Sequence, residues 1–149
     1  IHRCGFEVAP IEGAVDIVLS QSVLEHVFPL EDTVAKIAAI QTAQTRFLHL
    51  VDFGNHYPTP SPFDGLYEQP PEAYIRQRGK AINLLRAPDI AAQFAAHGVA
   101  ATMIPTRKLA DHASGQVGGW WRERYDDDAL FTQLALVAGP AAAPDESAA

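Results

Sequence analysis

Apolar and polar residues alternate along this chain in blocks that predict strands and helices in turn. Val15–Leu19 is an apolar run interrupted only by Asp16, and a short run of this kind is typical of a strand buried on both faces of a parallel sheet. Pro29 follows with acidic residues close behind it, as at the start of a helix. We therefore expect a helix over about Leu30–Thr42 and a second buried strand over Arg46–Asp52.

The second half of the pattern begins with a long proline-rich segment, Phe53–Pro71. A segment of this length without regular structure is usually functional or mobile in a compact domain. The elements predicted beyond it are a short helix at Glu72–Arg78, a helix at about Ala87–His97 closed by Gly98, a strand at Val99–Pro105, a helical stretch at Trp120–Tyr125 and a strand at Phe131–Ala138. This order predicts an α/β sandwich with a mainly parallel sheet and an antiparallel C-terminal strand pair.

The chain divides into a region expected to fold and a region expected to be disordered. Residues 1–139 carry the strand and helix pattern and are expected to form one domain. Residues 140–149 are small and polar and contain prolines, so we expect a disordered tail. The first residues after Ile1 already resemble the middle of a domain, and we expect the chain to be part of a longer protein.

Composition narrows the classes of partner. The 149 residues are 48% hydrophobic and 19% charged, which suits one domain with a packed core. The net charge of −7 and the lack of a basic cluster argue against a nucleic-acid partner. No apolar run approaches the roughly 20 residues that span a bilayer, so no membrane association is expected. The single cysteine, Cys4, fits a reducing compartment, and we expect a cytoplasmic protein.

The segment Val15–Val27, VDIVLSQSVLEHV, is the most distinctive motif. It resembles the fourth strand and following turn of class I S-adenosylmethionine-dependent methyltransferases of the type 11-like group, which read Asp-apolar-Val-apolar, a polar turn, then Val-Leu-Glu-His-Val. The stretches His49–Tyr57 (HLVDFGNHY) and Ile82–Ile90 (INLLRAPDI) resemble a subgroup with a His-x-x-Asp strand end and a later Asn-x-x-Arg segment. The resemblance implies a Rossmann-like sandwich up to Gly139, with an antiparallel pair formed by its last two strands.

The chain departs from this family at its beginning. The family's glycine-rich cofactor loop and the acidic end of its second strand would lie before Ile1, and the third strand is at most a remnant around Arg3–Val8. Glu7 is the nearest candidate for the acidic residue beside the adenine. Thr42–Thr45 replaces the family's Lys-Pro-Gly-Gly turn. We therefore expect the chain to be the C-terminal portion of a methyltransferase domain, inactive alone and with weak or no binding of S-adenosylmethionine.

The polar turn after the first strand carries the other cofactor candidates. Ser20, Gln21 and Ser22 follow the strand, and in open α/β sheets ligands bind beyond the carboxyl ends of strands. The resemblance implies that these three residues touch the methionine part of the cofactor. The alternative interpretation is an ordinary polar strand-to-helix turn.

Asp52 and His56 are the candidate catalytic bases. Methyl transfer to a hydroxyl or an amine requires removal of the acceptor's proton, and a carboxylate or imidazole within hydrogen-bond reach performs this step. The alternative is that both residues are solvated loop groups or cap neighbouring backbone. A metal site is not expected, because His49 and Asp52 point to opposite faces of a strand.

Two residues of the motif Val15–Val27 have both a functional and a structural interpretation. Glu25 and His26 would shape the cofactor pocket in the functional interpretation. In the structural interpretation, Glu25 caps a backbone group and His26 is a buried, hydrogen-bonded histidine. We favour the structural interpretation for His26.

Tyr57, Asn83 and Arg86 are the candidate acceptor-binding residues. Arg86 offers a planar set of donors that suits a carboxylate, phosphate or sugar hydroxyls, and Tyr57 would line an acceptor pocket. The alternatives are that Tyr57 pins the loop to the core and that Arg86 pairs with Asp89 or a helix end.

Two functions are therefore predicted. The first is methyl transfer from S-adenosylmethionine to a small-molecule or glycan-like acceptor in the longer protein. The alternative is a non-catalytic, methyltransferase-like module that binds a partner through an exposed sheet edge. A missing first half would leave a strand edge and apolar faces uncovered, so self-association is also expected.

Overall fold

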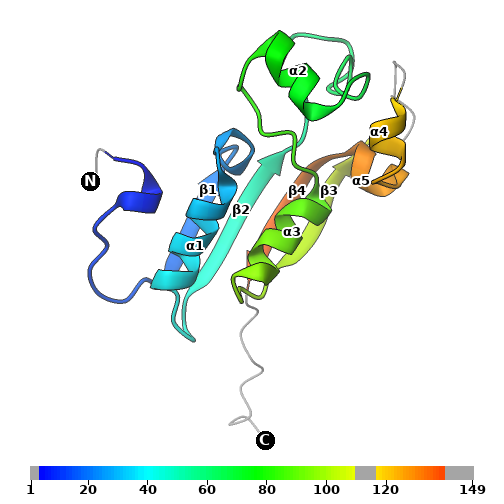
Figure 1. Ribbon diagram of the computed structural model, residues 1–149. Coiled ribbons are helices and arrows are strands. Elements are labelled where there is room, and N and C mark those ends of the chain that lie inside the picture. Colours follow the sequence, from blue (N-terminus) through cyan, green and yellow to red (C-terminus); the bar gives the residue numbers. More distant parts are fainter. Residues whose placement is uncertain (1–3, 110–116, 140–149) are drawn as a thin grey trace, which may run out of the picture.

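Four strands form one mixed sheet in the computed structural model, which describes residues 4–109 and 117–139 (Figure 1). In chain order the elements are the 3-10 helix η1 (Phe6–Val8), β1 (Ile17–Gln21), the 3-10 helix η2 (Leu24–His26), α1 (Leu30–Ile40), β2 (Arg46–Asp52), α2 (Pro71–Arg78), α3 (Ala87–Ala96), β3 (Thr102–Lys108), α4 (Gly119–Arg122), α5 (Asp127–Phe131) and β4 (Thr132–Gly139). The strand order is β1-β2-β4-β3. The described part of the chain is therefore a mixed α/β structure.

Strands β1 and β2 form the parallel pair, with register from Ile17 opposite Arg46 to Gln21 opposite Leu50. The connection between them is α1, whose apolar side chains Leu30, Val34 and Ile37 are 0–2% exposed against the sheet. The expected order of strand, helix and strand is confirmed, and β2 has the predicted bounds. Because the two strands are parallel, their carboxyl ends lie side by side, at the top of Figure 1.

The last strand lies between two earlier ones. Strand β4 pairs antiparallel with both β2 and β3. The predicted antiparallel C-terminal pair is confirmed. The prediction of a mainly parallel sheet is wrong. Because β4 lies between β2 and β3 and is antiparallel to both, β1–β2 is the one parallel pair among the described strands.

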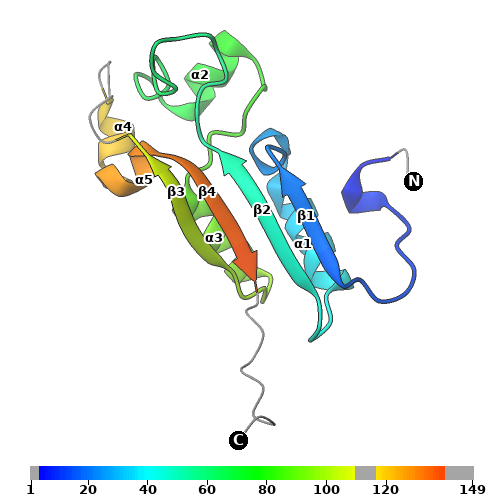
Figure 2. The same ribbon diagram turned by 180° about the vertical axis from the view of Figure 1, so that it is seen from behind.

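The two faces of the sheet differ in what covers them. Helices α1 and α3 lie along one face, and a cluster of buried side chains that includes Phe47, Val51 and Val137 fills the space beneath them (Figure 1). No helix of the described residues crosses the opposite face (Figure 2). On β1, Ile17 and Leu19 are 61% and 66% exposed. The expectation of a first strand buried on both faces is therefore wrong, because only one face has a helix layer.

A second apolar cluster lies beyond the carboxyl ends of the strands. It joins the proline-rich loop and α2 to the α4–α5 segment, and Trp121 at its centre has no exposed surface. Asp126 precedes α5 and caps it: its carboxylate accepts a hydrogen bond from the Ala129 amide at 2.8 Å. None of the helices among the described residues has the length and apolar character needed to span a bilayer.

The N-terminal segment does not form the expected strand remnant. Its described part holds η1, which packs against α1 and has no strand beside it to pair with. Arg3, at the start of the predicted remnant, and the predicted disordered tail at 140–149 lie outside the described residues.

Candidate functional site

The turns that follow β1 and β2 are joined at the carboxyl edge of the parallel pair. The Ser22 amide donates to the Leu50 carbonyl at 2.9 Å, which extends the pairing of the two strands by one residue. The Asp52 amide donates to Oε1 of Glu25 at 3.3 Å. Glu25 thus caps a backbone group, as expected, and it does so on the neighbouring strand.

Four ionisable side chains meet at this edge and are called the edge cluster below: Glu25, His26, Asp52 and His56. Nε2 of His56 lies 3.8 Å from Oδ2 of Asp52, and the rings of His26 and His56 are 4.9 Å apart, edge to face. Glu25, His26 and His56 each offer one ligand atom, and these atoms lie within 4.8 Å of one another. The structure therefore brings the two predicted catalytic residues together and adds two residues of the motif.

Glu25 is the buried member of the edge cluster, with 3% of its surface exposed. Burial raises the pKa of its carboxyl above the usual value, and hydrogen bonds from backbone amides oppose that shift. Oε2 of Glu25 is buried and has no hydrogen-bond partner among the described residues. The expectation that His26 is buried is wrong: its side chain is exposed, because the single turn of η2 directs Glu25 inward instead.

His56 is held in a left-handed conformation, with φ at 58°. The side-chain oxygen of Asn55 accepts from the Tyr57 amide at 3.0 Å, which closes a tight turn around His56. The buried Asn55 amide donates in turn to Thr59 Oγ1 and to the Asp64 carbonyl, at 2.9 and 2.8 Å. Left-handed non-glycine residues are enriched at functional sites, and this one fixes the direction of an imidazole.

Asn83 fastens the η2 turn from the segment before α3. Its side-chain amide donates to the carbonyls of Leu24 and Val27 at 2.7 and 3.2 Å, and its backbone amide donates to the Glu25 carbonyl at 2.7 Å. Asn83 was predicted to bind an acceptor. In the structure its side-chain amide is committed to the turn, so it positions the edge cluster.

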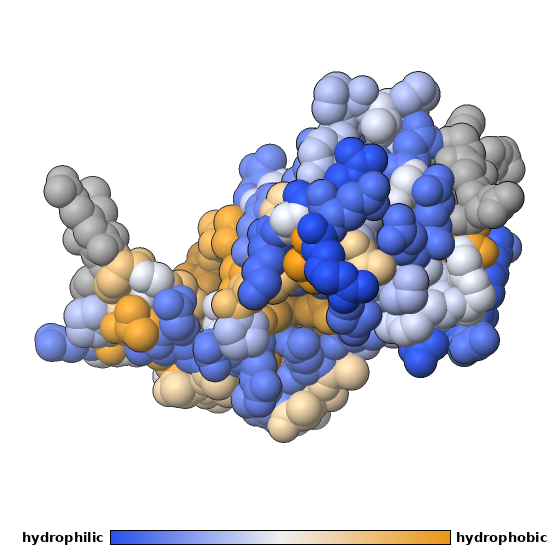
Figure 3. Space-filling view, turned by 45° about the horizontal axis from the view of Figure 1, so that its top comes forward, coloured by the Kyte–Doolittle hydropathy of each residue, from blue (hydrophilic) through white to orange (hydrophobic). Residues whose placement is uncertain are grey.

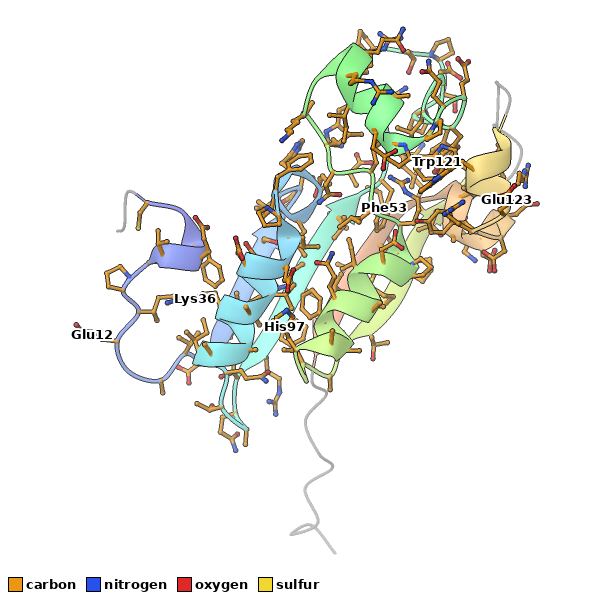
Figure 4. The ribbon with its side chains drawn as sticks, in the orientation of Figure 1. Glu12, Lys36, Phe53, His97, Trp121 and Glu123 are labelled. Atoms are coloured by element: carbon orange, nitrogen blue, oxygen red, sulfur yellow. The ribbon has the colours of Figure 1, made fainter. Side chains whose placement is uncertain are left out.

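Arg86 lies in the second apolar cluster and is 1% exposed. Its guanidinium donates to the Phe53 carbonyl and to the Tyr67 hydroxyl, each at 2.9 Å, and lies over the rings of Phe53 and Trp121. These two aromatic residues are labelled in Figure 4. The predicted role as an acceptor anchor does not fit this placement, because no face of the guanidinium is open to a ligand. Of the alternatives, a contact with Asp89 is present through the Arg86 backbone amide at 2.6 Å.

Tyr57 follows His56 and remains 37% exposed. Its hydroxyl donates to the Arg78 carbonyl at 3.2 Å, and the Arg78 guanidinium lies 5.3 Å from the ring centre. The ring is therefore tied to the end of α2, beside the edge cluster, with one part open to solvent.

A pocket of about 420 Å³ lies on the helix side of β1, between η1, η2 and α1. Figure 3 shows apolar surface in the hollow between the N-terminal segment and the body of the molecule. The polar residues that line the pocket are Glu7, Ser20, Thr33 and His49. Two predicted cofactor residues, Ser20 and Glu7, thus face one pocket, whereas Gln21 and Ser22 are exposed outside its lining.

Ser20 and His49 are paired in the wall of this pocket. Ser20 Oγ and His49 Nδ1 are 2.7 Å apart. His49 is 2% exposed, and burial lowers its pKa to about 4, so the imidazole is neutral near pH 7. Its Nε2 is buried without a hydrogen-bond partner among the described residues. No carboxylate orients this histidine, which distinguishes the pair from a nucleophilic triad.

The sequence analysis missed the Ser20–His49 pair, although a signal for it existed. Each residue is the fourth of its strand, and the parallel register places them directly opposite each other. The placement of His49 and Asp52 on opposite sides of β2 agrees with the prediction, since burial alternates along the strand.

The chain matches no protein-family model, no curated protein and no solved structure. The edge cluster and the pocket are therefore the features of the structure that bear on its function. The pocket suits a ligand that is largely apolar with a few polar groups. The edge cluster can remove a proton or hold a cation.

Proposed function

We propose that this chain is the C-terminal part of a class I methyltransferase domain that transfers a methyl group from S-adenosylmethionine to a small-molecule or glycan-like acceptor. One observation carries the proposal. The parallel pairing of β1 and β2 brings the carboxyl end of β1, where Ser20 lines the pocket, beside the carboxyl end of β2, where Asp52, on the opposite face of the sheet from Ser20, lies 3.8 Å from His56. Ligands of open α/β sheets bind at such edges.

The fold supports the same family. The motif segment Val15–Val27 spans β1 and the η2 turn, which is where the resemblance expects a strand and the turn after it. The antiparallel pairing of β3 and β4 also agrees with the Rossmann-like sandwich that the resemblance implies.

The pocket offers polar groups that complement the cofactor. The Ser20 hydroxyl offers a donor and an acceptor to the methionine end, and the Glu7 carboxylate, the candidate beside the adenine, lines the same pocket. The volume of about 420 Å³ lies within the range of small-molecule sites. Gln21 and Ser22 lie just beyond the pocket on the same turn.

Asp52 and His56 supply the proton acceptor. The sulfonium already activates the methyl carbon, so the protein's tasks are to align the acceptor and to take its proton. The Asp52 carboxylate, 3.8 Å from the His56 ring, stabilises the imidazolium that forms when His56 accepts that proton. Tyr57, beside them, is placed to contact the acceptor.

Cofactor binding is tested directly on the 149-residue chain. S-Adenosylhomocysteine is titrated into ¹⁵N-labelled protein up to millimolar concentrations, and amide shifts are followed. We expect weak binding, with shifts confined to the turn at Ser20–Ser22 and to the segment around Glu7. Ser20→Ala should weaken the response, and Thr106→Ala, an exposed hydroxyl on β3, should not. Tight binding, or shifts spread elsewhere in the chain, would contradict the proposal.

The base is tested in an active methyltransferase that contains this chain. General bases contribute roughly 10²–10⁴-fold to rate, so Asp52→Asn and His56→Ala should each slow turnover at least about tenfold. Unchanged rates in both variants would remove these residues from the mechanism.

The open sheet face favours a second candidate, an interaction module without catalysis. Leu48 and Ile104 are 42% and 46% exposed on this face, in addition to Ile17 and Leu19. The outer edge of β1 has no strand beside it among the described residues and carries neither charge nor proline, the features that usually protect an edge. Loss of partner binding in Leu48→Lys, a residue outside the pocket lining, with normal ligand shifts in the pocket would favour this candidate.

A further inference from the structure

We propose that Glu25, His26 and His56 bind a divalent transition-metal ion of the zinc type. The three residues come from two turns, the η2 turn after β1 and the loop after β2, and each offers a ligand atom within 4.8 Å of the others. A metal ion with bonds of about 2 Å fits between ligand atoms at such separations after small side-chain rotations. The site goes beyond methyl transfer and does not depend on it.

Glu25 supplies the strongest argument. Its carboxyl is 3% exposed, and one of its oxygens accepts from the Asp52 amide. The other oxygen, Oε2, is buried without a partner among the described residues. Buried carboxylates are paired or coordinate a metal, and an unsatisfied buried oxygen costs about 1–3 kcal/mol. A cation between Glu25 and the two imidazoles satisfies that oxygen.

His26 is prepared for coordination by its other ring nitrogen. Nδ1 of His26 lies 2.5 Å from the Ala81 carbonyl oxygen. Because a carbonyl oxygen only accepts hydrogen bonds, Nδ1 carries a proton, which leaves the lone pair of the neutral imidazole on Nε2. Metal-binding histidines commonly donate their second N–H to a carbonyl in this way, which fixes the tautomer and orients the ring.

The backbone around the cluster is also fixed before any ligand arrives. Asn83 holds the η2 turn through the carbonyls on either side of it, and the Asn55 turn holds His56 in its left-handed conformation. The side chains therefore need little reorganisation to bind an ion.

The donor set selects the class of metal. Two imidazoles and one carboxylate match zinc and neighbouring transition metals, whereas magnesium and calcium prefer oxygen ligands alone. Three protein ligands leave a coordination position open, and His26 and His56 are exposed to solvent. Water or a hydroxyl oxygen bound there is acidified by the ion. With the ion in place His56 is a ligand, and Asp52 is left as the group that accepts a proton.

Zinc chloride is titrated calorimetrically into the purified chain under reducing conditions, without S-adenosylmethionine. We expect one zinc ion per chain, with no competition from magnesium. Loss of a partner that merely orients a ligand weakens metal affinity roughly 10–100-fold, so Glu25→Gln and His56→Ala should each raise Kd at least about a hundredfold. His97→Ala is the matched control, since His97 lies 3.9 Å from Glu31, outside the edge cluster (Figure 4), and should leave Kd unchanged.

A second measurement separates metal binding from damage to the fold. Glu25→Gln keeps an acceptor for the Asp52 amide and removes a buried charge, so its metal-free Tm should equal or exceed that of the wild type. Zinc should raise the Tm of the wild type and of His97→Ala, and not that of Glu25→Gln. Absence of zinc binding to the wild type, or zinc binding that Glu25→Gln and His56→Ala retain, would overturn the proposal. The cofactor titration is a separate measurement, so either proposal can fail alone.

Discussion

The two faces of the sheet carry similar apolar residues but meet different surroundings. On β2, Phe47 faces α1 and α3 and is 3% exposed, whereas its neighbour Leu48 faces the open side and is 42% exposed. The covered face also holds a polar pair, Ser20 and His49, at the wall of the pocket. The covered face therefore stabilises the fold and holds the pocket, while the open face is available for contact with another surface.

The largest expected effect is on the covered face. Phe47→Ala should lower the free energy of unfolding by about 3–5 kcal/mol, because it removes a ring packed 5.4 Å from Phe94 and leaves a cavity. Leu48→Ala should lower it by less than about 1 kcal/mol, since the removed atoms are already partly hydrated. Urea unfolding at constant pH measures both. Equal losses of unfolding free energy in the two variants would contradict the difference between the two faces.

Protonation of His49, on the covered face, is expected to have an intermediate effect on the free energy of unfolding. Its folded-state pKa, about 4, lies below the ordinary value of 6.5, so the unfolded chain binds a proton more readily. The stability that neutral His49 provides is complete above pH 6.5 and is lost as pH falls from 6.5 toward 4. The loss amounts to about 3 kcal/mol at its limit.

Urea unfolding of the wild type and of His49→Gln at several pH values between 4 and 7 isolates this contribution. The wild type should lose more stability on acidification than the variant, whatever their difference at pH 7. Parallel curves would mean that the imidazole is solvated in the native state.

The smallest effect on stability is expected on the open face. Leu19→Lys should change the free energy of unfolding by less than about 0.5 kcal/mol, because Leu19 is 66% exposed. It should nevertheless reduce self-association measured by sedimentation velocity at rising concentration, since charge disfavours edge and face pairing. Ala39→Lys adds the same charge at an exposed position on α1 and should leave association unchanged.

The sequence predicted elements better than their surroundings. Arg46–Asp52 is a strand with the predicted bounds, and α1 ends two residues before the expected Thr42. The same pattern failed to show that β1 has an open face, because an apolar run looks alike whether one or two layers cover it. The insertion of β4 between β2 and β3 was also missed, because pairing between distant segments leaves no local trace.

The candidate site shows the same division. Asp52 and His56 were predicted together from one short stretch, and they lie together. Arg86 was expected at a binding surface, but its guanidinium lies between aromatic rings and carbonyls contributed by distant segments. His26 was expected to be buried and is exposed, while its neighbour Glu25 is buried, because a single helical turn does not settle which of two neighbouring side chains points inward.

The position of β4 has a consequence for how the chain is made. Strand β3 pairs only with β4 in the described sheet, and β4 follows the other three described strands in the chain. Until Thr132–Gly139 has emerged, β3 has no backbone partner and β2 has one bare edge, which are the features that make nascent chains prone to aggregation. The sheet therefore closes only after β4 has been synthesised, and a chain truncated at Phe131 would lack the strand that joins β2 to β3.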